Sequence, residues 1–86
     1  MAHLYRITKQ KWLNDVEQSN EIIFEEQRPI ATKDGTVALC NEYKDMENMV
    51  GGEKVEFKVI LVDTESGMED MIHFVQKCIF HQPQPE

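Results

Sequence analysis

The chain has 86 residues, of which 41% are hydrophobic and 29% are charged. A chain of this length forms one domain with a modest core, because it buries only about 60% of its unfolded surface. Sixteen acidic residues against nine basic residues give a net charge of −7. This charge argues against direct binding to nucleic acid or to an anionic membrane surface, and it fits a basic protein partner.

The sequence contains no segment that predicts export or membrane insertion. Its longest uninterrupted apolar run is residues 59–62, and residues 1–10 have no signal-peptide core. We therefore expect a cytoplasmic protein. Cys40 and Cys78 are too few for the disulfide framework of a secreted domain, and because each lies in an apolar pattern we expect two free, buried thiols.

The N-terminal part of the chain predicts a strand followed by a helix. Residues 2–7 have the alternation of a short strand. Thr8 is a suitable helix N-cap, and a single apolar stripe follows it, formed by Trp12, Leu13 and Val16. We therefore expect a helix over about residues 9–19, with Asn20 at its exit.

A second strand is predicted over residues 21–27, with Ile22 and Phe24 on one face. Because proline cannot donate a backbone hydrogen bond, Pro29 restricts this region to an edge, a bulge or a turn. The segment is therefore not expected in the middle of a sheet.

The dipeptide Asp34-Gly35 predicts a β-hairpin, because both central residues of a type I′ turn need positive φ. Its arms would be residues 30–33 and 36–42. The next segment, residues 43–50, fits either a short helix stopped by the two following glycines or a loop.

The clearest pattern lies in residues 53–64, which predict the central strand of the sheet. Ile60 and Val62 make its second face apolar near the end, so we expect that end to be covered on both sides. The first face carries four apolar residues with a period of two: Val55, Phe57, Val59 and Leu61.

Residues 66–80 predict a further helix. Ser66 and Glu69 have the spacing of a capping box, and Asp70 adds negative charge to the first turn. Apolar residues then recur with helical spacing: Met68, Met71, Ile72, Val75, Cys78 and Ile79.

These elements follow the order β-α-β-β-(α)-β-α, in which the bracketed helix is the ambiguous segment 43–50. They predict an α+β domain with a small, mostly antiparallel sheet of about four strands and two helices packed on one face. Residues 1–82 are expected to form this single domain, and residues 83–86 a frayed C-terminal tail.

The sequence contains no recognisable catalytic set. Its paired glycines lack the neighbours of a phosphate-binding loop, and no nucleophile-elbow motif occurs. Cys78 and His81 are three residues apart on the predicted helix, but His73 lies about 140° around the helix from Cys78 and cannot complete a zinc site. Residues 63–70 are acidic, but Met68 takes the position where a calcium loop needs glycine. We therefore expect no metal and no cofactor, and we favour a protein that is not an enzyme.

A lone acidic α+β domain of this length, without a catalytic set, resembles in type the small inhibitors that phages encode against bacterial defence or host proteins. It is equally similar in type to bacterial immunity and adaptor proteins. The resemblance implies protein binding and assigns no residue a role.

The function predicted from these observations is that of a non-enzymatic acidic protein-binding module, which occupies a basic, nucleic-acid-binding site on a partner protein. Its carboxylates would then take the place of phosphates. The predicted contact residues lie in the ambiguous segment and at the junction of the last strand and helix: Glu42, Asp45, Glu47, Asp63, Glu65, Glu69 and Asp70.

The alternative is a small-molecule-binding, nucleotide-binding or catalytic domain that acts as a homodimer. Its anchor would be an anion site at the start of the first predicted helix, where backbone N–H groups lie near three cations. These cations are Arg6, Lys9 and Lys11.

Overall fold

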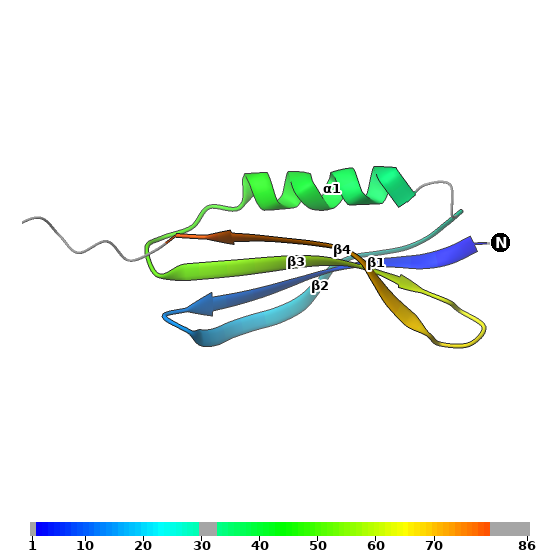
Figure 1. Cartoon of the computed structure of the whole chain (residues 1–86), viewed down its shortest axis with the longest axis horizontal. Coiled ribbons are helices and arrows are strands. Elements are labelled where there is room, and N and C mark those ends of the chain that lie inside the picture. The colour runs from blue at the N-terminus through cyan, green and yellow to red at the C-terminus, as the bar shows by residue number, and fades with distance from the viewer. Residues whose placement is uncertain (1, 30–32, 80–86) are drawn as a thin grey trace, which may run out of the picture.

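The computed structural model describes residues 2–29 and 33–79, and these residues form four strands and one helix (Figure 1). The α+β class and the four-stranded antiparallel sheet are confirmed, whereas the prediction of two helices is wrong for this part of the chain. No helix in the described ranges is long and apolar enough to cross a membrane. The elements are β1 (Ala2–Leu13), β2 (Val16–Pro29), α1 (Lys33–Met46), β3 (Glu53–Val62) and β4 (Glu69–Cys78).

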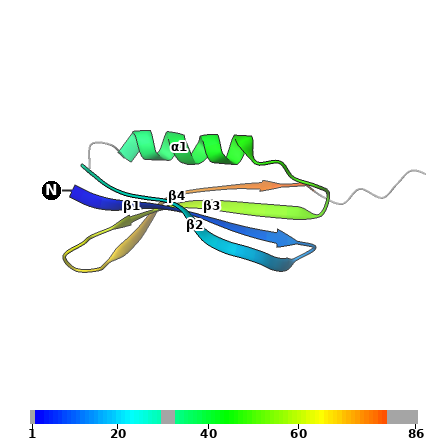
Figure 2. The ribbon, with the colours of Figure 1, turned by 180° about the vertical axis from the view of Figure 1, so that it is seen from behind.

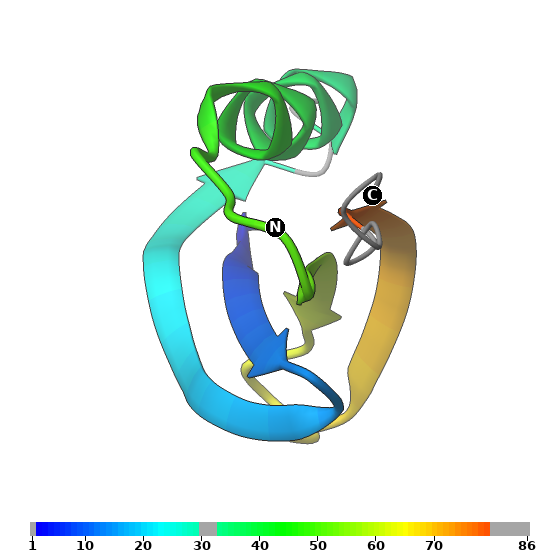
Figure 3. The same cartoon turned by 90° about the vertical axis from the view of Figure 1, so that its left-hand side faces the viewer.

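The sheet consists of two antiparallel hairpins, β1–β2 and β3–β4, which pair through β1 and β3 in the order β2-β1-β3-β4. Figure 2 shows the β1–β2 turn and the β3–β4 loop at opposite ends of the long axis. Viewed along that axis, the sheet is curved, with β2 and β4 at its sides (Figure 3). The helix α1 lies on one face of the sheet and packs against β3 and β4.

The helix predicted over residues 9–19 is wrong. These residues form the second half of β1, a two-residue turn and the start of β2. The turn residues Asn14 and Asp15 have φ values of 49° and 67°, as a type I′ hairpin turn requires. Pairing of β1 with strands on both of its sides therefore overrides the helical spacing of Trp12 and its neighbours.

The hairpin predicted at Asp34-Gly35 is also wrong, since both residues lie in the first turn of α1. The Asp34 carboxylate is favourable there, because the N-terminal end of a helix carries a partial positive charge. The ambiguous segment 43–50 is helical only as far as Met46. Residues 30–32 of the predicted hairpin lie outside the described residues.

The last predicted helix is a strand: residues 69–78 form β4, which pairs with β3 along its length. The capping box is wrong as well, because Ser66 lies in the β3–β4 loop and its Oγ accepts a hydrogen bond from the Met68 N–H at 3.2 Å. His81 and the predicted tail lie outside the described residues. The predicted pairing of His81 with Cys78 therefore also falls outside them.

Two of the three register shifts in the sheet, both of them β-bulges, decide which apolar residues face the core. In β4, Val59 lies opposite His73 and Ile60 opposite Met71, so that Ile72 is the extra residue. The register of β1 with β2 makes Ile23 the extra residue in the same way. Both bulge residues pack against the core. The β2 bulge also separates Ile22 from Phe24, so the prediction that they share a face is wrong.

The core lies between the helix and the two central strands. Strand β3 is internal to the sheet, as predicted, and its first face is buried. The Cys40 thiol is buried as predicted, but Cys78 is exposed, so its predicted burial is wrong. Fully buried side chains come from three elements: Tyr5, Ile7, Thr36, Cys40, Val55, Phe57 and Val59.

Candidate functional site

The sheet has a helix face, covered by α1, and an opposite face that we call the open face. Side chains alternate between the two along each strand, and directly paired residues point to the same side. On β1, Tyr5 and Ile7 therefore lie on the helix face, whereas Leu4 and Arg6 lie on the open face. No element of the described chain covers the open face (Figures 1 and 2).

The part of the open face next to the β3–β4 loop carries a group of apolar side chains, with Arg6, Thr8 and Lys58 among them. The register places Leu4 opposite Val62 and Ile60 opposite Met71. Three side chains remain well exposed there: Ile22 at 54%, Met71 at 58% and Phe74 at 41%. We call the group the apolar patch; its members are Leu4, Ile22, Ile60, Val62, Met71 and Phe74.

Arg6 crosses this patch and connects the two edge strands. Its Nε donates to Glu25 Oε2 on β2 at 2.9 Å, and its Nη1 donates to Glu69 Oε1 on β4 at 2.6 Å. The hydrogen bond to Glu25 is the main cause that raises the pKa of Arg6 above its ordinary value. The guanidinium charge is therefore balanced by two carboxylates of the same chain.

Four of the predicted contact carboxylates come together at the β3–β4 loop and the start of β4. This group, which we call the acidic end, is exposed throughout: Asp63, Glu65, Glu69 and Asp70. Asp63 Oδ1 accepts hydrogen bonds from the backbone N–H groups of Glu65 at 2.9 Å and Ser66 at 3.4 Å. These bonds lower the pKa of the Asp63 carboxyl and keep it charged. Of these four carboxylates, only Glu69 forms an ion pair with a cation of the described residues.

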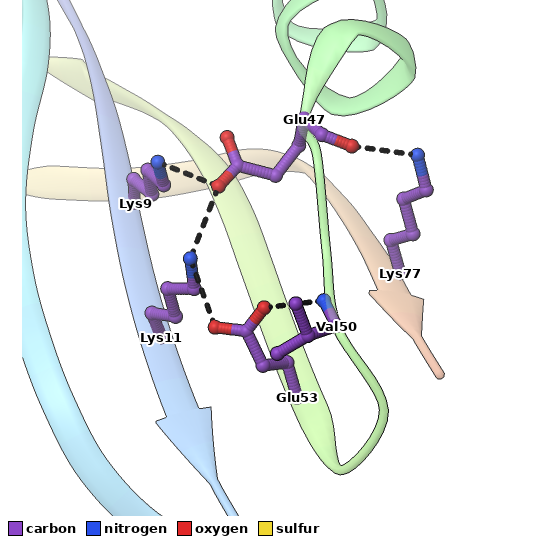
Figure 4. Close-up of polar contacts among 6 residues, drawn as sticks. All are labelled: Lys9, Lys11, Glu47, Val50, Glu53 and Lys77. Carbon is purple, nitrogen blue, oxygen red and sulfur yellow. Dashed lines mark hydrogen bonds and ion pairs between the residues drawn. The ribbon is translucent and has the colours of Figure 1, made fainter. Parts of the chain in front are cut away.

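The other three predicted contact residues lie on α1 and just after it. Glu42 and Asp45 are exposed on the helix, where Asp45 pairs with the neighbouring Lys44 at 3.2 Å. Glu47 has a different environment, because its carboxylate is directed towards β1 (Figure 4). The helix residues are therefore separate from the acidic end.

Glu47 belongs to a half-buried group on the helix face, which we call the lysine–glutamate cluster: Lys9, Lys11, Glu47 and Glu53. Glu47 Oε1 lies 2.8 Å from Lys9 Nζ and 3.6 Å from Lys11 Nζ, and Glu53 Oε2 lies 3.0 Å from Lys11 Nζ (Figure 4). Their side chains are only 11% to 24% exposed.

Backbone contacts complete this cluster. Glu53 Oε1 accepts the Val50 N–H at 2.7 Å, and the Glu47 carbonyl accepts a hydrogen bond from Lys77 Nζ at 2.9 Å. The bond from Val50, followed by the one from Lys11, lowers the pKa of Glu53, while the bond to Glu53 raises the pKa of Lys11. The cluster fixes the connection between α1 and β3 to the sheet.

The three cations of the predicted anion site do not converge. Arg6 lies on the open face, whereas Lys9 and Lys11 lie on the helix face. The helix N-terminus on which that prediction depended is absent, because all three residues lie in β1. The described residues contain no group of three or more His, Cys, Asp or Glu side chains that could hold a metal ion.

The apolar patch was missed from the sequence, although its members are ordinary strand residues. The signal would have been the alternation of β4, but the bulge at Ile72 interrupts it and leaves a spacing that imitates a helix. The acidic end was found because its four carboxylates are close in sequence.

Comparisons with protein-family models, with curated proteins and with solved structures found no significant match to this chain. We therefore infer the function from the geometry of the described residues.

Proposed function

We propose that this protein is a non-enzymatic binding module that engages a basic protein partner through its acidic end. The observation that supports this most strongly is the convergence of Asp63, Glu65, Glu69 and Asp70 at one exposed end of an elongated molecule. Carboxylates in this arrangement attract a cationic surface and orient it during the encounter. The net charge of −7 adds a long-range attraction of the same sign.

The partner surface that fits this end is rich in lysine or arginine. If that surface normally binds nucleic acid, the carboxylates take the place of phosphates, and binding of this protein excludes the nucleic acid. Asp63 is suited to this role, because its two backbone hydrogen bonds hold the carboxylate in one orientation and keep it ionised.

The nucleotide-binding alternative lacks comparable support. Its three proposed anchors lie on two faces of the sheet, and each already pairs with a carboxylate. No specific observation therefore favours it over protein binding.

The proposal is tested by identifying the partner from the acidic end itself. A photo-crosslinking side chain placed at Glu65 should capture a basic protein in the native host, whereas the same group at Glu42 on α1 should not. Both positions are exposed and acidic, so the second is a matched control.

The purified captured protein then provides the decisive measurement. The double variant Glu65→Gln/Asp70→Asn should slow association by about tenfold at low salt, and the loss should fade as salt is added. Glu42→Gln/Asp45→Asn removes the same charge from the helix and should change the rate far less. Equal losses in both variants, or an association rate that does not depend on salt, would contradict the proposal.

A further inference from the structure

The apolar patch has the dimensions of a short helix. Its residues occupy three successive cross-strand rows, from Val62 to the position of Lys58 on β3, and extend over all four strands. At about 3.3 Å per residue and about 4.8 Å between strands, this is an area of roughly 13 by 14 Å. An α-helix about 10 Å wide covers such an area with two to three turns.

The layer arrangement also favours a helix. The other face of the sheet is covered by α1, and a helix on the open face would complete a three-layer α/β/α arrangement, which buries both faces of a sheet. Ile22, Met71 and Phe74 are the side chains available for contact, and Met68 in the adjoining loop is 66% exposed. Methionine adapts its shape to an incoming apolar surface, as in other proteins that bind amphipathic helices.

The charges around the patch define the flanks of that helix. Glu25 lies on the β2 side, Glu69 of the acidic end lies on the β4 side, and Asp63 and Glu65 lie at the third side, in and before the β3–β4 loop. The cation within the patch, Arg6, is balanced by the first two carboxylates. Lys58 is a second cation, in the third row of the patch between Thr8 and Phe74. An apolar stripe flanked by lysine or arginine matches these three acidic sides.

A second copy of this chain matches these charges less well. It would bring a further net charge of −7 to the face, together with the same acidic end. Like charges placed across an interface oppose association.

We propose that the apolar patch binds an amphipathic helix of the partner, with its apolar stripe on Ile22, Met71 and Phe74 and its basic residues beside Glu25 and the acidic end. This inference rests on the proposed function, because the same basic partner supplies the helix. It assigns affinity to the patch, whereas the acidic end governs the rate of encounter.

The probe is a synthetic leucine–lysine peptide with an amphipathic helical pattern of about three turns. Two matched peptides accompany it: one has glutamate in place of every lysine, and the other has the same composition in a scrambled order. Dissociation constants are measured by fluorescence anisotropy with the full chain. The test variant is Met71→Ser/Phe74→Ser, and its control is Met46→Ser/Val50→Ser, which changes exposed apolar residues away from the patch. Ile22→Ser on β2 provides a second test variant, and thermal unfolding verifies that each variant is folded.

The proposal predicts that the leucine–lysine peptide binds and that the patch variants weaken it by about tenfold or more, with less than about a twofold effect in the control. The scrambled and glutamate peptides should bind far more weakly. Equal losses in patch and control variants would overturn the proposal.

Three further outcomes separate this inference from the proposed function. If Glu65→Gln/Asp70→Asn weakens binding and the patch variants do not, helix docking fails while the acidic end keeps its function. If the glutamate peptide binds to the patch as tightly as the lysine peptide, the proposal that the partner is basic is contradicted. If the protein dimerises and Met71→Ser/Phe74→Ser abolishes the dimer, the occupant is a second copy and the inference is overturned.

Discussion

At the residue scale, burial gives the two cysteine thiols different accessibility and different reactivity. Cys40 lies on the buried side of α1, and burial raises the pKa of its thiol to about 11, whereas Cys78 is exposed at the end of β4. Because the thiolate is the reactive form, Cys40 is protected by both low access and low ionisation. We expect a thiol reagent at pH 8 to label Cys78 rapidly and to label Cys40 only as the protein unfolds.

Single replacements assign the two labelling phases. Cys78→Ser should remove the fast phase, and Cys40→Ser should remove the slow one. Two fast phases in the wild-type protein would contradict the buried position of Cys40.

Two glycines make a second prediction at this scale. Gly52 has φ of 88°, and a Cβ there would lie 2.5 Å from Asn14 Oδ1, whereas Gly35 lies in α1 with nothing within 4 Å of its Cβ position. Gly52→Ala should therefore lower the free energy of unfolding by about 1–2 kcal/mol, mainly through the backbone strain. Gly35→Ala should raise it by up to about 1 kcal/mol, because alanine favours the helix. Chemical denaturation of both variants provides the measurement, and changes of the same sign would be inconsistent with these positions.

At the element scale, β4 is the segment in which sequence and structure disagree most. Its apolar residues satisfy a helical period, yet pairing with β3 and the bulge at Ile72 make it an edge strand. Local spacing cannot distinguish these states, because the strand is stabilised by partners that are distant along the chain. The hairpin turn at Asn14 and Asp15 was missed for the same reason.

The assignments that were correct depended on local signals that the fold did not oppose. Residues 2–7 and 21–27 were correctly predicted as strand segments, although the bulge at Ile23 interrupts the alternation of the second, and the apolar face of β3 identifies the core. The acidic end was likewise visible, because a short loop keeps its carboxylates together. The apolar patch was not, since it requires the register of four strands and both bulges.

The strand assignment of β4 can be tested by comparing Met71→Asp with Val75→Asp. A helical stripe would place both residues in the core, but the strand exposes 58% of Met71 and packs Val75 against the core. Val75→Asp should therefore cost about 2–4 kcal/mol of unfolding free energy, and Met71→Asp less than about 1 kcal/mol. Gln76→Asp on the open face is the control and should resemble Met71→Asp. Equally large losses at residues 71 and 75 would exclude the strand.

At the scale of the whole molecule, the lowered carboxyl pKa values connect pH with stability. Glu53 and Asp63 both have a pKa below the ordinary value, so the unfolded chain binds more protons than the folded one in mild acid. Their stabilisation is fully present above the ordinary carboxyl pKa of about 4 and is lost as the pH falls through the folded values. We expect constant urea midpoints from pH 6 to 8 and a steep fall below about pH 4.

Glu53→Gln should make the urea midpoint fall less steeply below about pH 4, because it removes one of the two carboxyl groups whose pKa is lowered. The variant should also be less stable than the wild type at neutral pH, where Lys11 and the Val50 N–H lose a charged partner. An equally steep fall in the variant would show that the Glu53 contacts do not favour its charged form.

The central claim, that the β3–β4 end and the adjoining open face form the binding surface, is tested most directly by mapping backbone amide shifts. Labelled protein is titrated with the basic protein that is captured through residue 65. We predict shifts concentrated in β1 residues 4–8, in β2 residues 22–25 and in residues 60–74, with the lysine–glutamate cluster and α1 residues 36–46 unchanged. Shifts centred on α1, or on the β1–β2 turn at the other end of the molecule, would contradict the account.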